Sequence, residues 1–300
     1  MAALAVLSLQ DSFVKQLSYE LSLWQFQALR ASINLGFALI ICLVFLGGFE
    51  RPRSYRAVGL RSTVHVTTMV FFFGGVPFLS LSEIAAGLYT YPFFVALLSG
   101  TMLGERVGPR RLFAIAVGFI GVLLILRPGT EAFRPVALMP VCAGFFYALS
   151  VMTTRKLCRE ELPINLAIGV ALAFMALGVL GLGLFSVWHP GEIAIRWPYL
   201  LTGWRPLETW MTGIIVVCSV LNLVANVSMA KAYQSAESSW LAPFDYTYLI
   251  FATFWAVVVW AQVPDAMTIA GMALIAVSGG FVAWRERRAG RAVDLPPRGP

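Results

Sequence analysis

The most regular feature of the chain is a series of long apolar runs separated by short polar breaks. A clear pair lies within residues 82–129, where an uncharged run over 84–104 is followed by a basic break and a second apolar run over 112–126. An α-helix rises about 1.5 Å per residue, so about 20 apolar residues cross a hydrocarbon layer of about 30 Å. This stretch therefore predicts two membrane-crossing helices joined by a short basic connector.

The same pattern along the whole chain predicts ten membrane spans. These spans are 1–18, 24–46, 62–81, 84–104, 111–127, 135–155, 163–187, 208–230, 237–261 and 266–284. Most connections are very short. The longest, residues 189–207, is rich in proline and tryptophan, and we predict that it lies along the membrane surface.

The arrangement of apolar runs also indicates an internal repeat, because residues 236–285 again contain two runs around a short polar break. Glu83 lies nine positions before Pro92, and Glu237 lies nine positions before Tyr246. We interpret this as a divergent duplication. Five spans per copy is an odd number, so the second copy enters the bilayer upside down, as in many secondary transporters.

The predicted fold is therefore an all-α polytopic membrane protein with ten transmembrane helices in two inverted-topology five-helix repeats. The first repeat is predicted over residues 1–130 and the second over 135–288. Residues 289–300 are basic and then rich in proline, and they are predicted to be a disordered cytoplasmic tail.

Composition agrees with a membrane protein. Hydrophobic residues make up 59% of the 300 positions and charged residues 12%, whereas about a quarter of a soluble domain is charged. The net charge of +7 does not indicate nucleic-acid binding, because the basic residues lie in alternate short loops and in the tail. Sixteen Lys and Arg fall on one predicted side and five on the other, which places both termini in the cytoplasm.

Motifs for catalysis are absent from the sequence. There is no HExxH, no GxSxG, no phosphate-binding glycine loop and no acidic cluster for a metal. The four cysteines are scattered without metal-ligand spacing, which favours small core residues. We therefore predict no enzyme activity, no cofactor and no metal.

Ionisable side chains inside spans are the strongest pointers to function, because each is costly at the middle of a bilayer. Asp11 and Lys15 stand one turn apart, where they either neutralise each other or belong to a site. Arg30 lies about 9 Å deeper than Trp24 at 1.5 Å per residue. It either extends outward to water, pairs with Asp11 or Glu83, or holds an anionic group in a cavity.

Two further acidic residues, Glu83 and Asp245, are candidates for the site. Glu83 follows serines at the start of a span, as the helix dipole favours, and helix capping explains it at least as well as a site does. Asp245 lies inside the ninth span between Phe244 and Tyr246, two residues after Pro243. Because proline loosens a membrane helix, chiefly where protein or a cavity satisfies the backbone, we predict that the fourth and ninth spans line the pathway.

Other polar and aromatic side chains leave alternatives open. Asn222 and Asn226 form a polar stripe that serves either interhelical hydrogen bonds or a ligand. The aromatic candidates either stack on a planar substrate or pack in the membrane. The complete set of predicted substrate-binding residues is Asp11, Lys15, Arg30, Glu83, Tyr89, Tyr91, Asn222, Asn226, Trp240, Asp245 and Tyr246. Two glycine pairs, 118/121 and 178/181, predict close helix packing.

Two stretches carry a family resemblance, TYPFFVALLSGTMLGERVGPRRLFAIAVGFIGVLLILRPG and LAPFDYTYLIFATFWAVVVWAQVPDAMTIAGMALIAVSGGFVAWRER. They resemble the paired EamA domains of the drug/metabolite transporter superfamily, and the likeness extends over essentially the whole chain, with Lys15 ending the first span and Arg30 early in the second. The resemblance implies a ten-helix inner-membrane carrier of small organic metabolites. The sequence departs from it at Gln262, where the second half usually carries Glu.

The function that these observations predict is a secondary transporter that moves a small organic metabolite across the inner membrane by alternating access. Its expected partners are a small-molecule substrate and the lipid bilayer, with the protein as a monomer or homodimer. Two alternatives stay open: a polytopic membrane enzyme acting on a lipid-linked substrate, and a non-transporting accessory subunit. Amino acids, flavins, adenosylated compounds and cationic drugs all remain candidate substrates.

Overall fold

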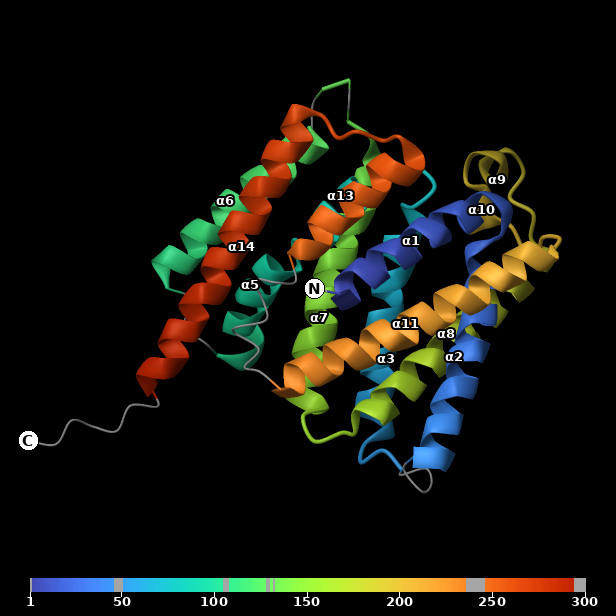
Figure 1. The fold of residues 1–300 in the computed structure, drawn as a ribbon, viewed down its shortest axis with the longest axis horizontal. Helices are drawn as coiled ribbons and strands as arrows, with labels where there is room; N and C mark the ends of the chain where they lie inside the picture. The colour runs from blue at the N-terminus through green and yellow to red at the C-terminus, as the bar shows by residue number, and fades with distance from the viewer. Residues whose placement is uncertain are drawn as a thin grey trace, which may run out of the picture.

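The computed structural model describes residues 2–45, 51–104, 108–127, 130–131, 133–235 and 246–293. All regular structure within these ranges is helical, as the sequence predicts (Figure 1). The helices are α1 (Ala2–Glu20), α2 (Leu23–Phe45), α3 (Tyr55–Gly74), α4 (Leu81–Leu88), α5 (Tyr91–Leu103), α6 (Pro109–Leu126), η1 (Pro135–Ala137), α7 (Leu138–Leu157), α8 (Pro163–Val187), α9 (Glu192–Arg196), α10 (Pro198–Leu201), α11 (Thr209–Ser235), α13 (Thr247–Trp260) and α14 (Ala266–Val293).

Within the described ranges, four helical stretches are long and apolar enough to cross a membrane, judged by length and composition. They are Leu23–Val44, Leu81–Met102, Pro135–Leu157 and Pro163–Val187. Shorter apolar helices cover Leu112–Leu126, Thr209–Ala225, Thr247–Trp260 and Ala266–Phe281. Helix α1 is not in either group because it is rich in polar residues, and it buries many of them, among them Gln10, Asp11 and Lys15. A helix that buries its polar residues in this way lies inside the bundle.

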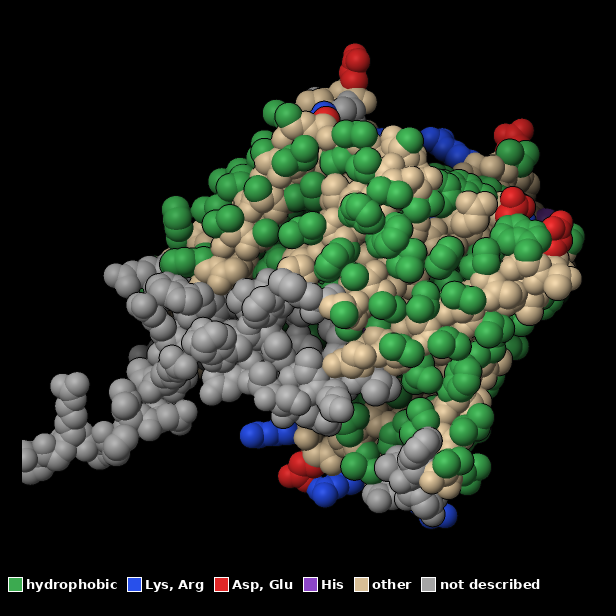
Figure 2. Space-filling view, in the orientation of Figure 1, with side chains coloured by type: hydrophobic (Ala, Val, Ile, Leu, Met, Phe, Trp, Pro, Cys, Tyr) green, Lys and Arg blue, Asp and Glu red, His purple; other side chains and the backbone are tan. Residues whose placement is uncertain are grey.

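The outer surface of the bundle is apolar over its middle and charged at its ends. In Figure 2, hydrophobic side chains cover most of the visible face, and the acidic and basic side chains gather toward the upper, right-hand and lower margins. Large exposed side chains such as Leu180, Ile250 and Val277 contribute to this surface. A contiguous apolar surface of this kind is unsuited to water and suited to lipid.

The helices associate in pairs that join the two halves of the chain. Helix α6 packs along α14 and α2 along α8, while α3 contacts α7 and α1 contacts both α11 and α13. Helices α6 and α14 lie side by side at the left of Figure 1. Halves that are distant in sequence therefore form one bundle with a shared core.

Close helix packing occurs at the glycine pairs that the sequence indicates. A Cβ atom on Gly118 would lie 2.0 Å from the Phe93 ring, and one on Gly121 would lie 2.7 Å from the carbonyl oxygen of Gly271. On α8, a Cβ on Gly178 would come within 2.8 Å of the α2 backbone, and one on Gly181 within 2.3 Å of the Trp24 ring. The packing role predicted for both pairs is confirmed.

The predicted fourth span is broken into two helices. Helix α4 ends at Leu88 and α5 begins at Tyr91, with Pro92 in its first turn. Proline has no N–H to donate and disfavours helical backbone at the preceding residue, which explains the interruption. Thr90 partly satisfies the break by donating its hydroxyl to the Gly87 carbonyl oxygen at 2.7 Å.

Two predicted boundaries differ from the structure. The third helix covers 55–74 and not 62–81, because Ser54 caps its N-terminus by accepting a hydrogen bond from the Ala57 N–H. The chain then turns, and Ser80 begins α4 with its own cap. At the other end, α14 continues to Val293. The predicted tail from residue 289 is therefore helical over its first five positions, and 294–300 lie outside the described residues.

Candidate functional site

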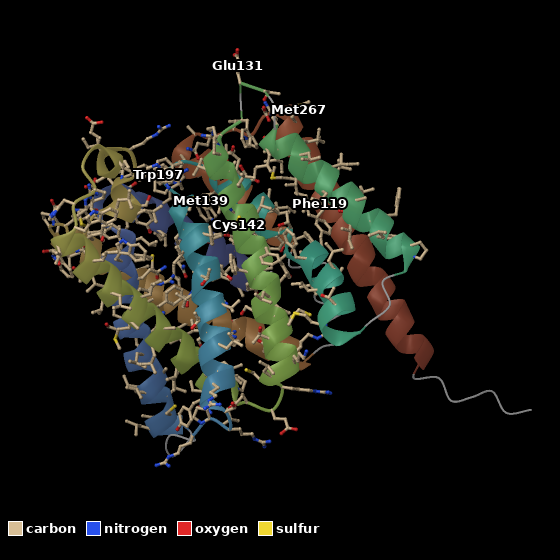
Figure 3. All side chains as sticks on the ribbon, turned by 180° about the vertical axis from the view of Figure 1, so that it is seen from behind. Phe119, Glu131, Met139, Cys142, Trp197 and Met267 are labelled. Carbon is tan, nitrogen blue, oxygen red and sulfur yellow. The ribbon has the colours of Figure 1, made fainter. Side chains whose placement is uncertain are left out.

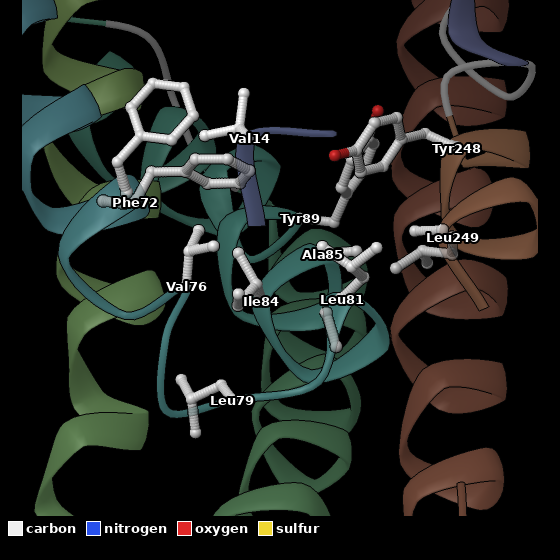
Figure 4. Close-up of a cluster of buried hydrophobic side chains, with 14 of the residues drawn as sticks. Val14, Phe72, Val76, Leu79, Leu81, Ile84, Ala85, Tyr89, Tyr248 and Leu249 are labelled. Atoms are coloured by element: carbon white, nitrogen blue, oxygen red, sulfur yellow. The ribbon is translucent and has the colours of Figure 1, made fainter. Parts of the chain in front are cut away.

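Four tyrosines meet where the broken helix of the first half approaches the start of α13 in the second half. The Tyr89 ring lies 5.5 Å from the rings of both Tyr246 and Tyr248, and 5.9 Å from that of Tyr91. Figure 4 shows Tyr89 and Tyr248 side by side above the apolar cluster that contains Ile84. The interruption at Pro92 places the ends of two helix segments, with their aromatic side chains, at the contact between the halves. We refer to Tyr89, Tyr91, Tyr246 and Tyr248 as the tyrosine cluster.

Asp11 is attached to the tyrosine cluster from α1. Its carboxylate is 7% exposed and accepts a hydrogen bond from the Tyr248 hydroxyl on α13. The two residues are 237 positions apart in the chain, so this contact joins the first half to the second. A buried carboxylate is tolerated where a donor satisfies it, and Tyr248 supplies that donor.

Arg30 is buried in α2 without a hydrogen-bond acceptor among the described residues. Its side chain is 5% exposed, and its guanidinium carbon lies 5.2 Å from the ring centroid of Phe26, 5.1 Å from that of Phe73 and 5.5 Å from that of Phe174. Aromatic faces stabilise a desolvated cation, which explains how the charge is accommodated. The titratable groups that act electrostatically on the Arg30 guanidinium are Cys218, Asp11 and Tyr199. Arg30 makes no ion pair within 4 Å, with Asp11 or with Glu83.

Lys15 and Glu83 lie at one end of the bundle and separate from Arg30. Lys15 Nζ donates to the Leu79 carbonyl oxygen at 2.7 Å and to Gln262 Oε1 at 2.9 Å. It does not pair with Asp11, although the two residues are one turn apart. The amide oxygen of Gln262 accepts this bond at the position where the family resemblance leads one to expect a carboxylate.

Glu83 has the capping role that its position predicts. It forms a capping box with Ser80 at the start of α4 and an ion pair with Arg134 at 2.8 Å. Lys15 and Glu83 therefore stabilise turns at this end of the bundle. Of Asp11, Lys15, Arg30 and Glu83, which the sequence predicts as substrate-binding residues, only Asp11 and Arg30 lie deeper in the bundle.

The remaining predicted residues are placed as follows. The Tyr91 ring packs edge-on at 4.9 Å against Tyr147 of α7. Asn222 lies on α11, one turn beyond the buried Cys218 and partly buried itself. The side chain of Asn226 and all of Trp240 and Asp245 lie outside what the structure describes.

Several buried polar side chains were missed in the sequence. Gln10, Gln27 and Tyr199 are 2%, 1% and 1% exposed, and each has a side-chain oxygen without a hydrogen-bond partner. Gln27 lies three positions before Arg30, a spacing that places both on one helical face and that could have indicated it. Nothing in the sequence marks Tyr199, because it comes from the connection predicted to lie on the membrane surface.

An apolar crevice lies apart from this group, between α4, α6, α7 and α14. Its lining includes Gly87, Val122, Pro140 and Ile275, and the one charged side chain on it is Glu83. Among the described residues, no three His, Cys, Asp or Glu side chains are placed to hold a metal ion. The four cysteines are free, and three are buried, as expected of core residues.

Comparison with known proteins identifies the family. The model of the EamA-like transporter family matches the chain twice, over residues 1–127 and 134–284. The chain belongs to the EamA-like transporter family. The two EamA matches place the boundary between the halves at residues 128–133, in the connection between α6 and η1.

Relatives of this EamA-like chain are named as transporters of several molecules. It is 28% identical to a riboflavin transporter of Vibrio cholerae over 69% of this chain and 64% of the relative, which is just under two thirds of that protein. It is 24% identical to a pseudopaline exporter of Pseudomonas aeruginosa, over 90% of this chain and 89% of the relative. It is 22% identical to an S-adenosylmethionine uptake transporter of Rickettsia felis, over 76% and 74%.

The fold also has a counterpart among solved structures. One crystal structure matches with a TM-score of 0.52 and 19% identity, and the match covers 98% of this chain and 100% of the other. At this identity the likeness concerns the fold alone. With its apolar helices and two EamA repeats, the chain is a multi-pass membrane protein.

The two EamA repeats are joined at one end of the bundle by polar contacts. Besides the Lys15–Gln262 bond, Arg127 pairs with Asp265 across the ends of α6 and α14. Figure 3 shows Glu131, in the connection between the repeats, and Met267, near the start of α14, toward this same end. These contacts join the two repeats at that end of the bundle.

The Arg127–Asp265 pair makes a testable prediction about pH. The hydrogen bond from Arg127, assisted by the Thr268 N–H, lowers the pKa of Asp265 from 3.8 to about 2. A lowered folded-state pKa stabilises the protein above the unfolded value, and this contribution is lost as pH falls through about 2. The effect is small because the Asp265 side chain is half-exposed.

The measurement is thermal unfolding of the purified protein between pH 5 and pH 2. The wild type is expected to lose more stability over this range than Asp265→Asn, which keeps an oxygen to cap α14 but carries no charge. Arg127→Gln should reduce the same pH dependence. Equal pH profiles for the wild type and both variants would contradict the assignment.

Proposed function

We propose that this EamA-like protein is a secondary transporter that moves a small organic metabolite across the bacterial inner membrane by alternating access. The substrate site is placed at the contact between the two repeats, around Asp11, Arg30 and the tyrosine cluster. The excess of Lys and Arg in alternate loops supports cytoplasmic termini. The end closed by Lys15 and Arg127 then faces away from the cytoplasm.

The pairing of helices supports inverted repeats. If α1, α2, α3 and α6 correspond to α7, α8, α11 and α14, a two-fold axis in the membrane plane brings α2 onto α8 and α6 onto α14. It also turns the α3–α7 contact into an α11–α1 contact, and the contact of α4 and α5 with α7 into a contact of α13 with α1. All of these contacts occur. Two-fold related halves are the arrangement that alternating access uses.

The single observation that carries the proposal is the contact between Asp11 and Tyr248. It places a buried carboxylate from one repeat on a hydroxyl of the other, beside an interrupted helix. Interrupted membrane helices commonly form substrate sites near the midplane, because their free backbone groups and side chains face a cavity and not lipid. A substrate that reaches this contact binds both repeats at once, so its binding can be coupled to their relative movement.

The chemistry of the site supports a partly planar, polar substrate. Tyrosine rings offer flat apolar faces with hydroxyls at their edges, which suits stacking on a conjugated ring. Arg30 and Asp11 supply one charge of each sign. Riboflavin and S-adenosylmethionine, which name two of the relatives, both contain planar ring systems and serve here as probes.

Transport is tested with purified protein in liposomes. Riboflavin, S-adenosylmethionine and a panel of amino acids are first screened by thermal shift, since a ligand at a hundredfold excess over its Kd stabilises the native state by about 2.7 kcal/mol. A compound that raises the unfolding temperature of the protein is expected to enter liposomes that contain the protein faster than it enters protein-free liposomes. Asp11→Asn should lower that uptake at least about tenfold, as removal of a polar contact of about 1.4 kcal/mol implies.

The control variant is Tyr55→Phe, which alters an exposed tyrosine at the start of α3 and should leave uptake unchanged. Compounds that stabilise the protein but never cross the liposome membrane would contradict transport. That result would favour the accessory-subunit alternative. Chemical conversion of such a compound by the protein would favour the enzyme alternative.

A further inference from the structure

We propose that Arg30, Gln27 and Tyr199 form a buried subsite that accepts an anionic oxygen group, a carboxylate or a phosphate. This inference rests on the proposed transport function and narrows it to molecules that carry such a group. No ligand assignment is needed for the argument, because it follows from hydrogen-bonding groups that are buried and unpartnered.

The polar groups of the proposed subsite have unfilled hydrogen bonds. Among the described residues, both polar atoms of the Gln27 amide and the Tyr199 hydroxyl are buried and have no hydrogen-bond partner. Arg30, 5% exposed, also has no acceptor among the described residues. Buried polar groups are nearly always satisfied by protein, water or ligand, so a group of them together indicates an occupant.

The three residues of the proposed subsite lie on two neighbouring helices, α2 and α10. Gln27 and Arg30 lie three positions apart on α2, so their side chains emerge on the same face of that helix. Tyr199 approaches from α10, which contacts both α1 and α2, and it lies close enough to Arg30 for each to influence the other electrostatically. The subsite is therefore formed on α2, with α10 in contact with that helix and with Phe73 of α3 and Phe174 of α8 beside the guanidinium.

The connection that carries Tyr199 is anchored to α2 by hydrogen bonds. The Trp24 indole N–H donates to the Leu200 carbonyl oxygen at 2.7 Å. The Gln25 amide makes two bonds with the backbone of Arg205, donating at 2.9 Å and accepting at 3.0 Å. These bonds fix the connection on the C-terminal side of Tyr199 to the first turn of α2. Trp197, labelled in Figure 3, adds a ring contact of 4.6 Å with Phe78. Tyr199 is thus held next to α2 by a segment anchored to that helix.

The positive charge of the subsite is the Arg30 guanidinium. A guanidinium stays protonated in proteins and presents its N–H groups in a fixed plane that fits two oxygens of a carboxylate or phosphate. The three phenylalanine rings contact the cation but accept no conventional hydrogen bond. Asp11 forms no ion pair with Arg30 within 4 Å and already accepts a hydrogen bond from the Tyr248 hydroxyl. The guanidinium therefore has its donors available to an anion.

The neutral members of the subsite are Tyr199 and Gln27. The Tyr199 hydroxyl and the Gln27 NH₂ group supply two more donors beside the guanidinium, and the Gln27 oxygen can accept from a protonated or hydroxylated part of the ligand. Donors outnumber acceptors in this group. An anionic oxygen group accepts several hydrogen bonds, whereas an ammonium group accepts none, so the composition favours the anion.

The test measures thermal unfolding of the full-length protein in detergent with sodium acetate, sodium phosphate or sodium chloride at equal ionic strength. An oxyanion at about tenfold excess over its Kd should raise the unfolding temperature by about 3 °C relative to chloride. The acetate and phosphate arms distinguish a carboxylate from a phosphate. In Arg30→Gln the shift should disappear, and in Arg30→Lys, which keeps the charge but loses the planar fork, it should fall to less than half.

Two further variants complete the design. Tyr199→Phe removes one hydroxyl and should reduce the shift without abolishing it, and it serves in place of Arg30→Gln if that variant does not fold. Arg196→Gln changes an exposed arginine on the neighbouring α9 and should keep the full shift. Equal shifts in the wild type, Arg30→Lys and Tyr199→Phe, or no shift with either oxyanion, would overturn the subsite.

The result is separable from the transport proposal. If liposomes transport a metabolite but the oxyanion shift does not depend on Arg30 or Tyr199, the subsite is wrong and transport stands. If the shift depends on these residues but no metabolite crosses, the subsite stands as a binding site and transport is wrong.

Discussion

Replacing Gly271 with valine is expected to lower the stability of the protein by about 3 kcal/mol or more, because it forces α6 away from α14. A Cβ on Gly271 would lie 2.6 Å from the Gly121 carbonyl oxygen, and a Cβ on Gly121 would lie 2.7 Å from the Gly271 carbonyl oxygen. Both contacts are to backbone, which cannot move aside as a flexible side chain can. The two helices approach each other at these glycines because neither has a side chain.

The matched control lies on the same helix. Gly280 belongs to α14, and a Cβ at that position would meet nothing within 4 Å. Gly280→Val should therefore cost far less stability than Gly271→Val in a chemical or thermal unfolding experiment on detergent-solubilised protein. Equal losses for the two variants would mean that the α6–α14 contact is not tight at Gly271.

The second large effect is expected at Tyr248. Tyr248→Phe removes the hydroxyl that donates to Asp11 and leaves a buried carboxylate without its donor. Such a group costs about 1–3 kcal/mol, and more when it is charged. Because this bond joins the two repeats at the proposed substrate site, we expect both a lower unfolding temperature and at least about a tenfold loss of transport rate, as about 1.4 kcal/mol would give.

A double-mutant cycle separates this bond from general damage to the core. In Asp11→Asn the carboxylate is already gone, so adding Tyr248→Phe should cost about 0.5–3 kcal/mol less than it does in the wild type. Tyr55→Phe removes a hydroxyl from an exposed tyrosine and should have no effect on either measurement. Strict additivity of Asp11→Asn and Tyr248→Phe would show that the two side chains do not interact energetically.

The placement of ionisable residues also bears on how the transporter would cycle. The contacts of Lys15 with Gln262 and of Arg127 with Asp265 join the repeats at one end, while Asp11 and Tyr248 join them deeper in the bundle. Under the proposed mechanism, opening the closed end requires the first two contacts to break. The Arg127–Asp265 pair is partly exposed, and contacts near water are weaker because solvent replaces the bonds that are lost. Lys15 is 1% exposed, so its bond to Gln262 is the costlier of the two to break.

Much of the fold follows from local sequence. Apolar runs about as long as a bilayer is thick predict most of the helices, and glycines at 118, 121, 178 and 181 predict where helices approach closely. Pro92 marks the point where the fourth span is interrupted. These features can be predicted because they depend on neighbours in the chain: helix length on hydropathy, breaks on the missing N–H of proline, and close approach on the missing side chain of glycine.

The candidate site depends on partners that are distant in the sequence. Asp11 and Lys15 look equivalent along the chain, one turn apart on the same helix. The structure gives Asp11 to Tyr248 on α13, and it gives Lys15 to Leu79 and Gln262 at the end of the bundle. Sequence reasoning identified Arg30 but not Tyr199, since a residue in a long connection has no periodic pattern that would indicate burial. Hydropathy determines which helices form in this protein, whereas only tertiary packing decides which of their polar side chains meet, because those contacts join residues 64 to 247 positions apart.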